Sequence, residues 1–154
     1  MIVVSDTSCI SNLLSVEQES LLPRLFGEVV IPPAFERELL RFHAGLPEFL
    51  KRVAPTDQGR LSRLRQELDP GEAEAISLAC ELKADRLLID ESVGRAVALR
   101  EGLPIIGLVG VLVAAKHSGL LAAVGPVLRR LENDAGFRLS ASLKADTLRA
   151  VGEA

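Results

Sequence analysis

Two apolar runs that each end at an aspartate constrain the fold of this chain more than any other feature. They are VVSDTS at residues 3–8 and LLIDES at residues 87–92, and a helical pattern follows each of them. In an α/β protein such runs form strands of a parallel sheet, and the acid after each strand lies at the carboxyl edge, where these folds build binding sites. The pattern therefore predicts that Asp6 and Asp90, far apart in the sequence, meet at one edge of one sheet.

The order of the expected elements indicates the architecture. Strands are expected at residues 2–5, 28–31, 86–89 and 103–107, with a short edge strand at 136–140. Helices are expected around residues 10–14, at 21–26, 33–41, 58–68, 70–83, 92–101, 110–117 and 125–134, and before residue 149, whereas 43–55 has the pattern of a loop. This alternation predicts a three-layer α/β/α sandwich with a mostly parallel sheet. Without a linker or repeat, residues 1–154 are expected to form a single domain.

The composition is that of an ordinary globular protein and excludes several classes. Hydrophobic residues make up 48% of the chain and charged residues 25%, and the longest apolar runs are too short to span a membrane. The start lacks the features of a secretory signal, so a cytoplasmic protein without a membrane partner is expected. Cys9 and Cys80 are then expected to be reduced core residues. With a net charge of −3 and neither Trp nor Tyr, any contact with nucleic acid needs a local patch of Arg and Lys.

Each of the two aspartates has two interpretations. An Asp directly before a helix is a good N-cap, and capping alone explains either residue. The repetition of the pattern, with a hydroxyl residue close behind each acid, favours a functional site. In that case Thr7, Ser8 and Ser92 are expected to orient a carboxylate or a water molecule, and Glu91 either faces solvent or supports a neighbouring ligand.

A third acid, Glu38, lies in the helix expected at residues 33–41. It borders the apolar stripe that contains Phe35 and Phe42, whereas Glu36 points further toward solvent. A Glu in this position either turns outward or reaches into a site.

A fourth acid, Glu72, lies in the first turn of the helix that begins after Asp69. Asp69 is expected to be the N-cap, since Pro follows it and Glu stands three residues later. Glu72 lies at the top of the inward face of this helix, and Glu74 lies on its mostly polar face. Glu72 therefore either completes a capping box with Asp69 or enters a site.

Four acids gathered at a sheet edge predict a metal site. Crowded carboxylates repel one another, and a bound cation is the usual reason to assemble them. Hard oxygen ligands suit Mg²⁺ or Mn²⁺, and such an ion can activate water for attack on a phosphodiester. No nucleophilic triad competes with this interpretation, because His43 and His117 stand without partners in the sequence.

A set of short motifs along the chain resembles a known family. The motifs are Asp-Thr-Ser at residues 6–8, Phe-Gly-Glu-Val-Val-Ile-Pro at 26–32, Glu-Leu at 38–39, Gly-Glu-Ala-Glu-Ala-Ile at 71–76, Leu-Ile-Asp-Glu at 88–91, and the stretches 107–116 and 119–121. On these motifs the chain resembles the PIN domain, and more closely a small prokaryotic branch of it. The resemblance covers most of the chain, and the middle and late motifs are the specific ones.

The resemblance implies a three-layer α/β/α fold and metal-dependent cleavage of RNA, often by the toxin of a toxin–antitoxin pair. Carried over by position, it implies that Asp6, Glu38, Glu72 and Asp90 are the catalytic and metal-binding residues, with Mg²⁺ or Mn²⁺ as cofactor. PIN nucleases commonly have Asp where this chain has Glu72, and Thr or Ser where it has Leu88. One alternative is a non-catalytic PIN-like module that binds nucleic acid or protein. Another is a phosphatase or response-regulator-like domain that uses Asp6.

The expected partners are RNA and, by resemblance, an antitoxin-like protein. Arg95 and Lys116 follow the third and fourth expected strands, so they are the predicted RNA contacts near the carboxyl edge of the sheet. Residues 108–115 are apolar on almost every side, which predicts either the face of a homodimer or a buried core helix.

Overall fold

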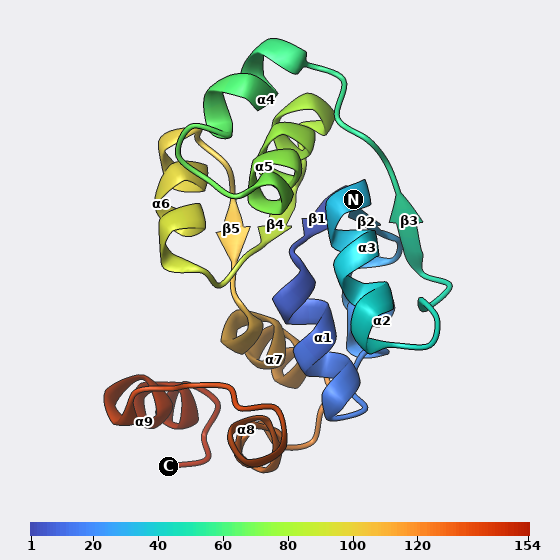
Figure 1. Cartoon of the computed structure of the whole chain (residues 1–154). Helices are drawn as coiled ribbons and strands as arrows, with labels where there is room; N and C mark the ends of the chain where they lie inside the picture. The colour runs from blue at the N-terminus through green and yellow to red at the C-terminus, as the bar shows by residue number, and fades with distance from the viewer.

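A five-stranded parallel sheet forms the centre of the computed structural model, which describes residues 1–154 (Figure 1). Its strands are β1 (Val3–Ser5), β2 (Val29–Ile31), β3 (Leu50–Arg52), β4 (Arg86–Leu88) and β5 (Ile105–Ile106). They lie in the order β3-β2-β1-β4-β5, and every neighbouring pair is parallel. The predicted three-layer α/β/α sandwich with a parallel sheet is confirmed.

Helices pack around this sheet. They are α1 (Thr7–Ser15), α2 (Leu21–Phe26), α3 (Pro33–Phe42), α4 (Gln58–Leu64), α5 (Pro70–Leu82), α6 (Ser92–Arg100), α7 (Leu108–His117), α8 (Gly125–Asp134) and α9 (Ala141–Ala150). Helix α5 packs on β1 and β4 and contacts α3 and α4, whereas α2 packs on β2 and α7. Helices α8 and α9 lie below the sheet in the view of Figure 1, where α8 contacts α1 and α9 contacts α7.

The strand order reverses between β1 and β4. From β1 the chain moves outward through β2 to β3, and it then returns to β4 on the other side of β1. In a parallel sheet, this reversal opens a crevice beyond the carboxyl ends of the two strands. Asp6 follows β1 directly and Asp90 follows β4 by two residues, so both lie at this point.

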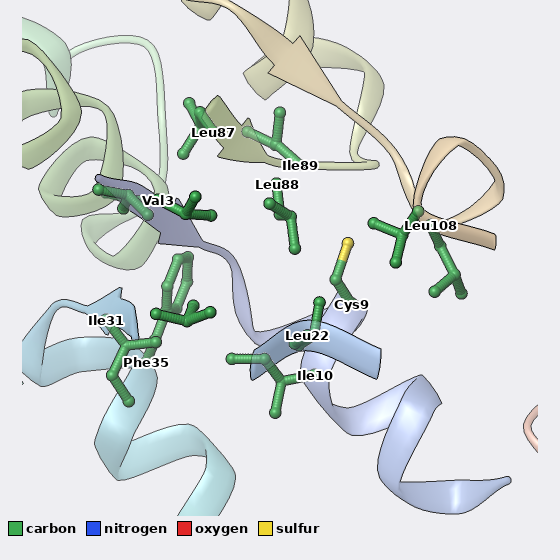
Figure 2. Close-up of a cluster of buried hydrophobic side chains, with 14 of the residues drawn as sticks. Val3, Cys9, Ile10, Leu22, Ile31, Phe35, Leu87, Leu88, Ile89 and Leu108 are labelled. Carbon is green, nitrogen blue, oxygen red and sulfur yellow. The ribbon is translucent and has the colours of Figure 1, made fainter. Parts of the chain in front are cut away.

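The central strands are buried on both faces, which is why their sequences are continuous apolar runs. All residues of β1 and β2 are buried. Figure 2 shows side chains of the central strands close to residues of α1, such as Ile10. Helix α5 is buried on nearly every side, because its small residues let it lie close to the sheet and to α3 and α4. Glu74 is therefore buried, and its predicted position on a polar face is wrong.

Two edge predictions are wrong for local reasons. Strand β3 lies inside the segment predicted as a loop. The prediction missed this strand because Lys51 and Arg52 are exposed, so its sequence has no apolar pattern. Residues 136–140 do not form a strand. Gly136 adopts a φ of 67°, and the Phe137 N–H donates to the Leu131 carbonyl at 3.0 Å, so this segment closes α8 instead of joining the sheet.

The apolar helix α7 is a core element. Its residues Leu108, Val111, Leu112 and Ala115 are buried, and α2 and α9 pack against it. Core packing thus explains the pattern that also predicted a homodimer face. No helix combines the length and the hydropathy that crossing a lipid bilayer requires.

Candidate active site

The carboxyl ends of β1 and β4 bring Asp6 and Asp90 together, as predicted. The Asp6 N–H donates to the Leu88 carbonyl at 2.8 Å, which continues the pairing of the two strands. The Asp90 N–H donates to Asp6 Oδ2 at 3.2 Å. Asp6 therefore links the residue that follows β1 to the end of β4 and to Asp90, through its backbone N–H and its carboxylate.

Asp6 is the N-cap of α1, so the capping interpretation of this residue is confirmed. Its Oδ1 accepts from the Cys9 N–H at 2.9 Å, and its Oδ2 accepts from the Ser8 hydroxyl at 3.1 Å. Asp6 is only 5% exposed. Burial raises the pKa of the Asp6 carboxyl most, hydrogen bonds from the N–H groups of Cys9 and Asp90 lower it in part, and the charge of Asp90 raises it.

Sequence reasoning predicts only a core residue at Cys9, whereas its thiol links the two aspartates. Cys9 Sγ donates to Asp90 Oδ2 at 3.1 Å. Figure 2 shows the sulfur projecting from α1 toward Leu88 and Leu108. Burial, followed by the charges of Asp6 and Asp90, raises the pKa of the thiol well above its ordinary value, so the thiol stays a protonated donor. The three-residue spacing from Asp6 is the signal that places Cys9 on the same side of the first turn. Cys80 is also a free thiol but is partly exposed.

Asp90 fastens the start of α7. Both of its carboxylate oxygens accept from the Leu108 N–H at 3.2 Å. Gly107 permits this approach, because a Cβ at that position would lie 2.6 Å from Asp90 Oδ1 and 3.0 Å from Arg95 Nη1. Glycine at position 107 thus leaves room for the carboxylate to lie against the backbone.

A hollow of about 360 Å³ beside Asp6 gathers several predicted site residues. Its walls come from α1, α3, α5 and the residues that precede α5 and α6. The charged residues of this acidic hollow are Asp6, Glu38, Asp69, Glu72 and Glu91, and no Lys or Arg lines it. Three of the four predicted acids thus share one hollow, whereas Asp90 borders a different one.

The pKa of Glu72 is raised strongly in the acidic hollow. Burial, and then the charges of Asp69, Glu91 and Asp6, raise the pKa of its carboxyl from 4.5 to about 7. Asp69 Oδ1 accepts from the Glu72 N–H at 2.9 Å, so the predicted cap at Asp69 is confirmed. Glu72 lines the hollow together with Glu91, whose charge acts on it.

Glu38 reaches the hollow because α3 and α5 approach closely at Gly71. A Cβ on Gly71 would lie 2.6 Å from the Phe35 ring and 3.3 Å from Glu38 Oε1. Phe42 also lines the hollow but is 77% exposed, so its predicted place in a buried stripe is wrong. It lies at the end of α3, where the helix passes beyond the core.

The residues predicted to support the site lie in different places. Thr7 and Ser8 line the acidic hollow, and the buried Thr7 Oγ1 has no hydrogen-bond partner. Glu91 caps α6, accepting from the N–H groups of residues 93 and 94 at 3.0 and 2.6 Å. Ser92 lies outside the hollow, in a shallow depression beside Glu67 and Arg100.

The two predicted RNA contacts differ in their surroundings. Arg95 borders the same hollow as Asp90, and its Nη1 donates to the Ile89 carbonyl at 2.8 Å. Lys116 is already paired, since its Nζ donates to the Ala122 carbonyl at 2.7 Å and lies 3.3 Å from Glu153. This pairing removes Lys116 from the RNA contacts that we propose.

A family model described as a PIN domain matches residues 2–153. The chain belongs to the PIN domain family. No curated protein matches its sequence. PIN domains are generally nucleases, and they typically use divalent metal ions.

The donor set of this PIN domain suits a hard divalent cation, although no three acidic, His or Cys side chains converge on one point. Five carboxylates line the acidic hollow without a basic side chain. Burial raises the pKa of Glu72 most, and the neighbouring negative charges, which a cation would relieve, raise it further. Carboxylate oxygens are also the ligands that Mg²⁺ and Mn²⁺ prefer.

Proposed function

We propose that this PIN domain is a divalent-metal-dependent endoribonuclease that cleaves RNA phosphodiesters at the acidic hollow. The main support is the meeting of Asp6 and Asp90 at the reversal of strand order, beside a hollow that has only acidic charged residues. Such a concentration of carboxylates is costly for folding alone and is typical of a site for a cation.

The residues of the site have different proposed roles. Asp6, Glu38, Glu72 and Asp90 would hold Mg²⁺ or Mn²⁺, which makes water more acidic and offsets charge on the phosphate when bound. Ser8 and the N–H of residue 9 keep the Asp6 carboxylate in a fixed orientation. With a pKa of about 7, Glu72 is about half protonated at neutral pH in the metal-free protein.

Calorimetric titration of Mn²⁺ into the wild type and the Asp6→Asn variant tests the metal site. Asn is an equally good N-cap, so the variant keeps α1 while it loses a charged ligand. We expect saturable binding by the wild type, loss of binding in Asp6→Asn, and unchanged binding in the control Asp134→Asn on α8. Cleavage of end-labelled single-stranded RNA with Mn²⁺ is expected to follow the same order. Full cleavage by Asp6→Asn would refute the assignment.

The alternative is a non-catalytic module that binds nucleic acid or a protein. It is favoured by the commitment of the Asp90 and Glu91 carboxylates to backbone N–H groups at helix starts. This alternative predicts RNA binding without cleavage in Mg²⁺ or Mn²⁺, and equal binding by the wild type and Asp6→Asn.

On the family resemblance, we also propose that the nuclease acts as the toxin of a toxin–antitoxin pair. Controlled expression in bacteria is then expected to arrest growth. Expression of Asp6→Asn at the same level is expected to leave growth unchanged, and growth arrest by both proteins would contradict a toxic nuclease.

A further inference from the structure

A second and larger hollow, of about 650 Å³, lies between β5, the start of α7 and the chain that connects α8 to α9. Its lining includes Asp90, Arg95, Ile106, Phe137, Arg138 and Leu143. We call it the arginine hollow. Asp90 also bonds through its N–H to Asp6, so the arginine hollow adjoins the proposed catalytic site.

The arginine hollow has available positive charge. Asp90 is the one acid in its lining, and the Leu108 N–H and the Cys9 thiol already donate to that carboxylate. Arg95 and Arg138 form no ion pair, and Arg138 is exposed. Two guanidinium groups that form no ion pair, beside a carboxylate that already accepts from protein donors, favour an anion, and guanidinium suits phosphate in particular.

The remaining walls are apolar and offer a flat aromatic surface. Phe137 is partly buried, and its backbone N–H is held by the Leu131 carbonyl at 3.0 Å. Leu143, 47% exposed, lines the same hollow together with Ile106. A base stacked on an aromatic ring gains affinity with little regard to its identity. The volume also lies within the range of small-ligand pockets.

We propose that the arginine hollow binds one nucleotide of the RNA strand next to the phosphodiester that is cut. Arg95 and Arg138 contact its phosphate, and its base lies against Phe137. The assignment of RNA as substrate rests on the proposed function. The hollow explains how a chain with a net charge of −3 and an acidic catalytic site holds a polyanion.

Fluorescence anisotropy with a short labelled single-stranded RNA tests this subsite, with Asp6→Asn as background to prevent cleavage. We expect Arg138→Gln to weaken binding roughly tenfold and to reduce the dependence of affinity on salt by about one phosphate contact. Loss of stacking in Phe137→Leu is expected to weaken binding at least about fivefold. Because Phe137 packs partly on the core, the exposed Leu143→Ser serves as a second wall variant. Arg129→Gln, on the exposed side of α8, is the matched control.

Unchanged RNA affinity in Arg138→Gln and Leu143→Ser, in a protein that binds the RNA, would overturn the subsite. Binding of a 5′-mononucleotide, but not of inorganic phosphate, would support recognition of both base and phosphate. Equal binding of the mononucleotide and of inorganic phosphate would show that the hollow binds only the anion, and it would contradict stacking of the base on Phe137. Binding of an acidic peptide in place of RNA, with the same sensitivity to Arg138→Gln, would show that the hollow serves a protein partner.

Failure of the proposed function has a different signature. If the protein cuts no RNA in any metal but loses affinity in Arg138→Gln, the subsite stands and the catalytic assignment does not. If the wild type cleaves RNA and Arg138→Gln leaves both KM and affinity unchanged, the catalytic assignment stands and the subsite does not.

Discussion

Replacement of Glu72 by Gln tests whether the negative charge of this residue in the acidic hollow destabilises the folded protein. In the unfolded chain Glu72 ionises near its ordinary pKa of 4.5, whereas in the folded protein its pKa is about 7. Between these values the folded state binds more protons, so the free energy of unfolding falls as the pH rises. The penalty is absent below pH 4.5 and complete above pH 7. Gln carries no charge at either pH, so the Glu72→Gln variant does not have this penalty.

The size of the effect follows from the interval between the two pKa values. A tenfold change in proton affinity is worth about 1.4 kcal/mol, so the shift from 4.5 to about 7 sets an upper limit of about 3 kcal/mol. Glu72 is partly exposed, and screening by water reduces the expected gain to about 1–2 kcal/mol. In a chain of 154 residues this raises Tm by about 3–6 °C.

Thermal unfolding of metal-free protein at pH 8 and at pH 4 measures the difference. We expect Glu72→Gln to be more stable than the wild type at pH 8 and nearly equal to it at pH 4, while it loses Mn²⁺ binding. The control Glu48→Gln, at an exposed carboxylate without a hydrogen bond or ion pair, is expected to change Tm little at either pH. An equal change for Glu72→Gln at both pH values would refute the electrostatic reasoning.

Three further predictions concern the supports of the site. Gly71→Ala places a Cβ 2.6 Å from a buried phenylalanine ring, so chemical denaturation should show a loss of about 1–3 kcal/mol. Cys9→Ala removes a donor to Asp90 and should lower Tm more than Cys9→Ser, which keeps a hydroxyl donor; the reverse order would contradict the proposed bond. Hydrogen bonds from the Val124 and Gly125 N–H groups lower the pKa of Glu153, so its stabilisation is complete above pH 4.5 and lost as pH falls further. Glu153→Gln should accordingly lower Tm at pH 7, and the difference from the wild type should shrink as the pH falls below 4.5.

The meeting of Asp6 and Asp90 could be predicted because it depends on a local pattern and one general property. Each acid follows a continuous apolar strand, and strands of that kind belong to parallel sheets whose carboxyl ends share an edge. The cap at Asp69 could be predicted for the same reason, since its partner lies within one helical turn. Strand β3 could not, because an edge strand with two exposed basic residues has no apolar pattern.

The division of the four acids between two hollows could not be read from spacing. Spacing along a helix places Glu38 beside an apolar stripe, but the approach of α5 at Gly71 decides that it reaches the acidic hollow. Asp90 faces the arginine hollow because α7, contributed by a later segment, offers it the Leu108 N–H. The thiol of Cys9 acquires its role in the same way, from a neighbour that the sequence does not place beside it.

The position of β1 at the centre of the sheet also governs the order in which the chain can fold. Strand β1 can pair with β2 as soon as β2 has been synthesised, but its other edge stays open until β4 has been synthesised. Contacts between such distant segments form late because closing a long loop costs entropy. The pair of Asp6 and Asp90 therefore cannot exist on a nascent chain that has not yet reached residue 90. Synthesis itself thus keeps the site unassembled until the segment that carries Asp90 has been made.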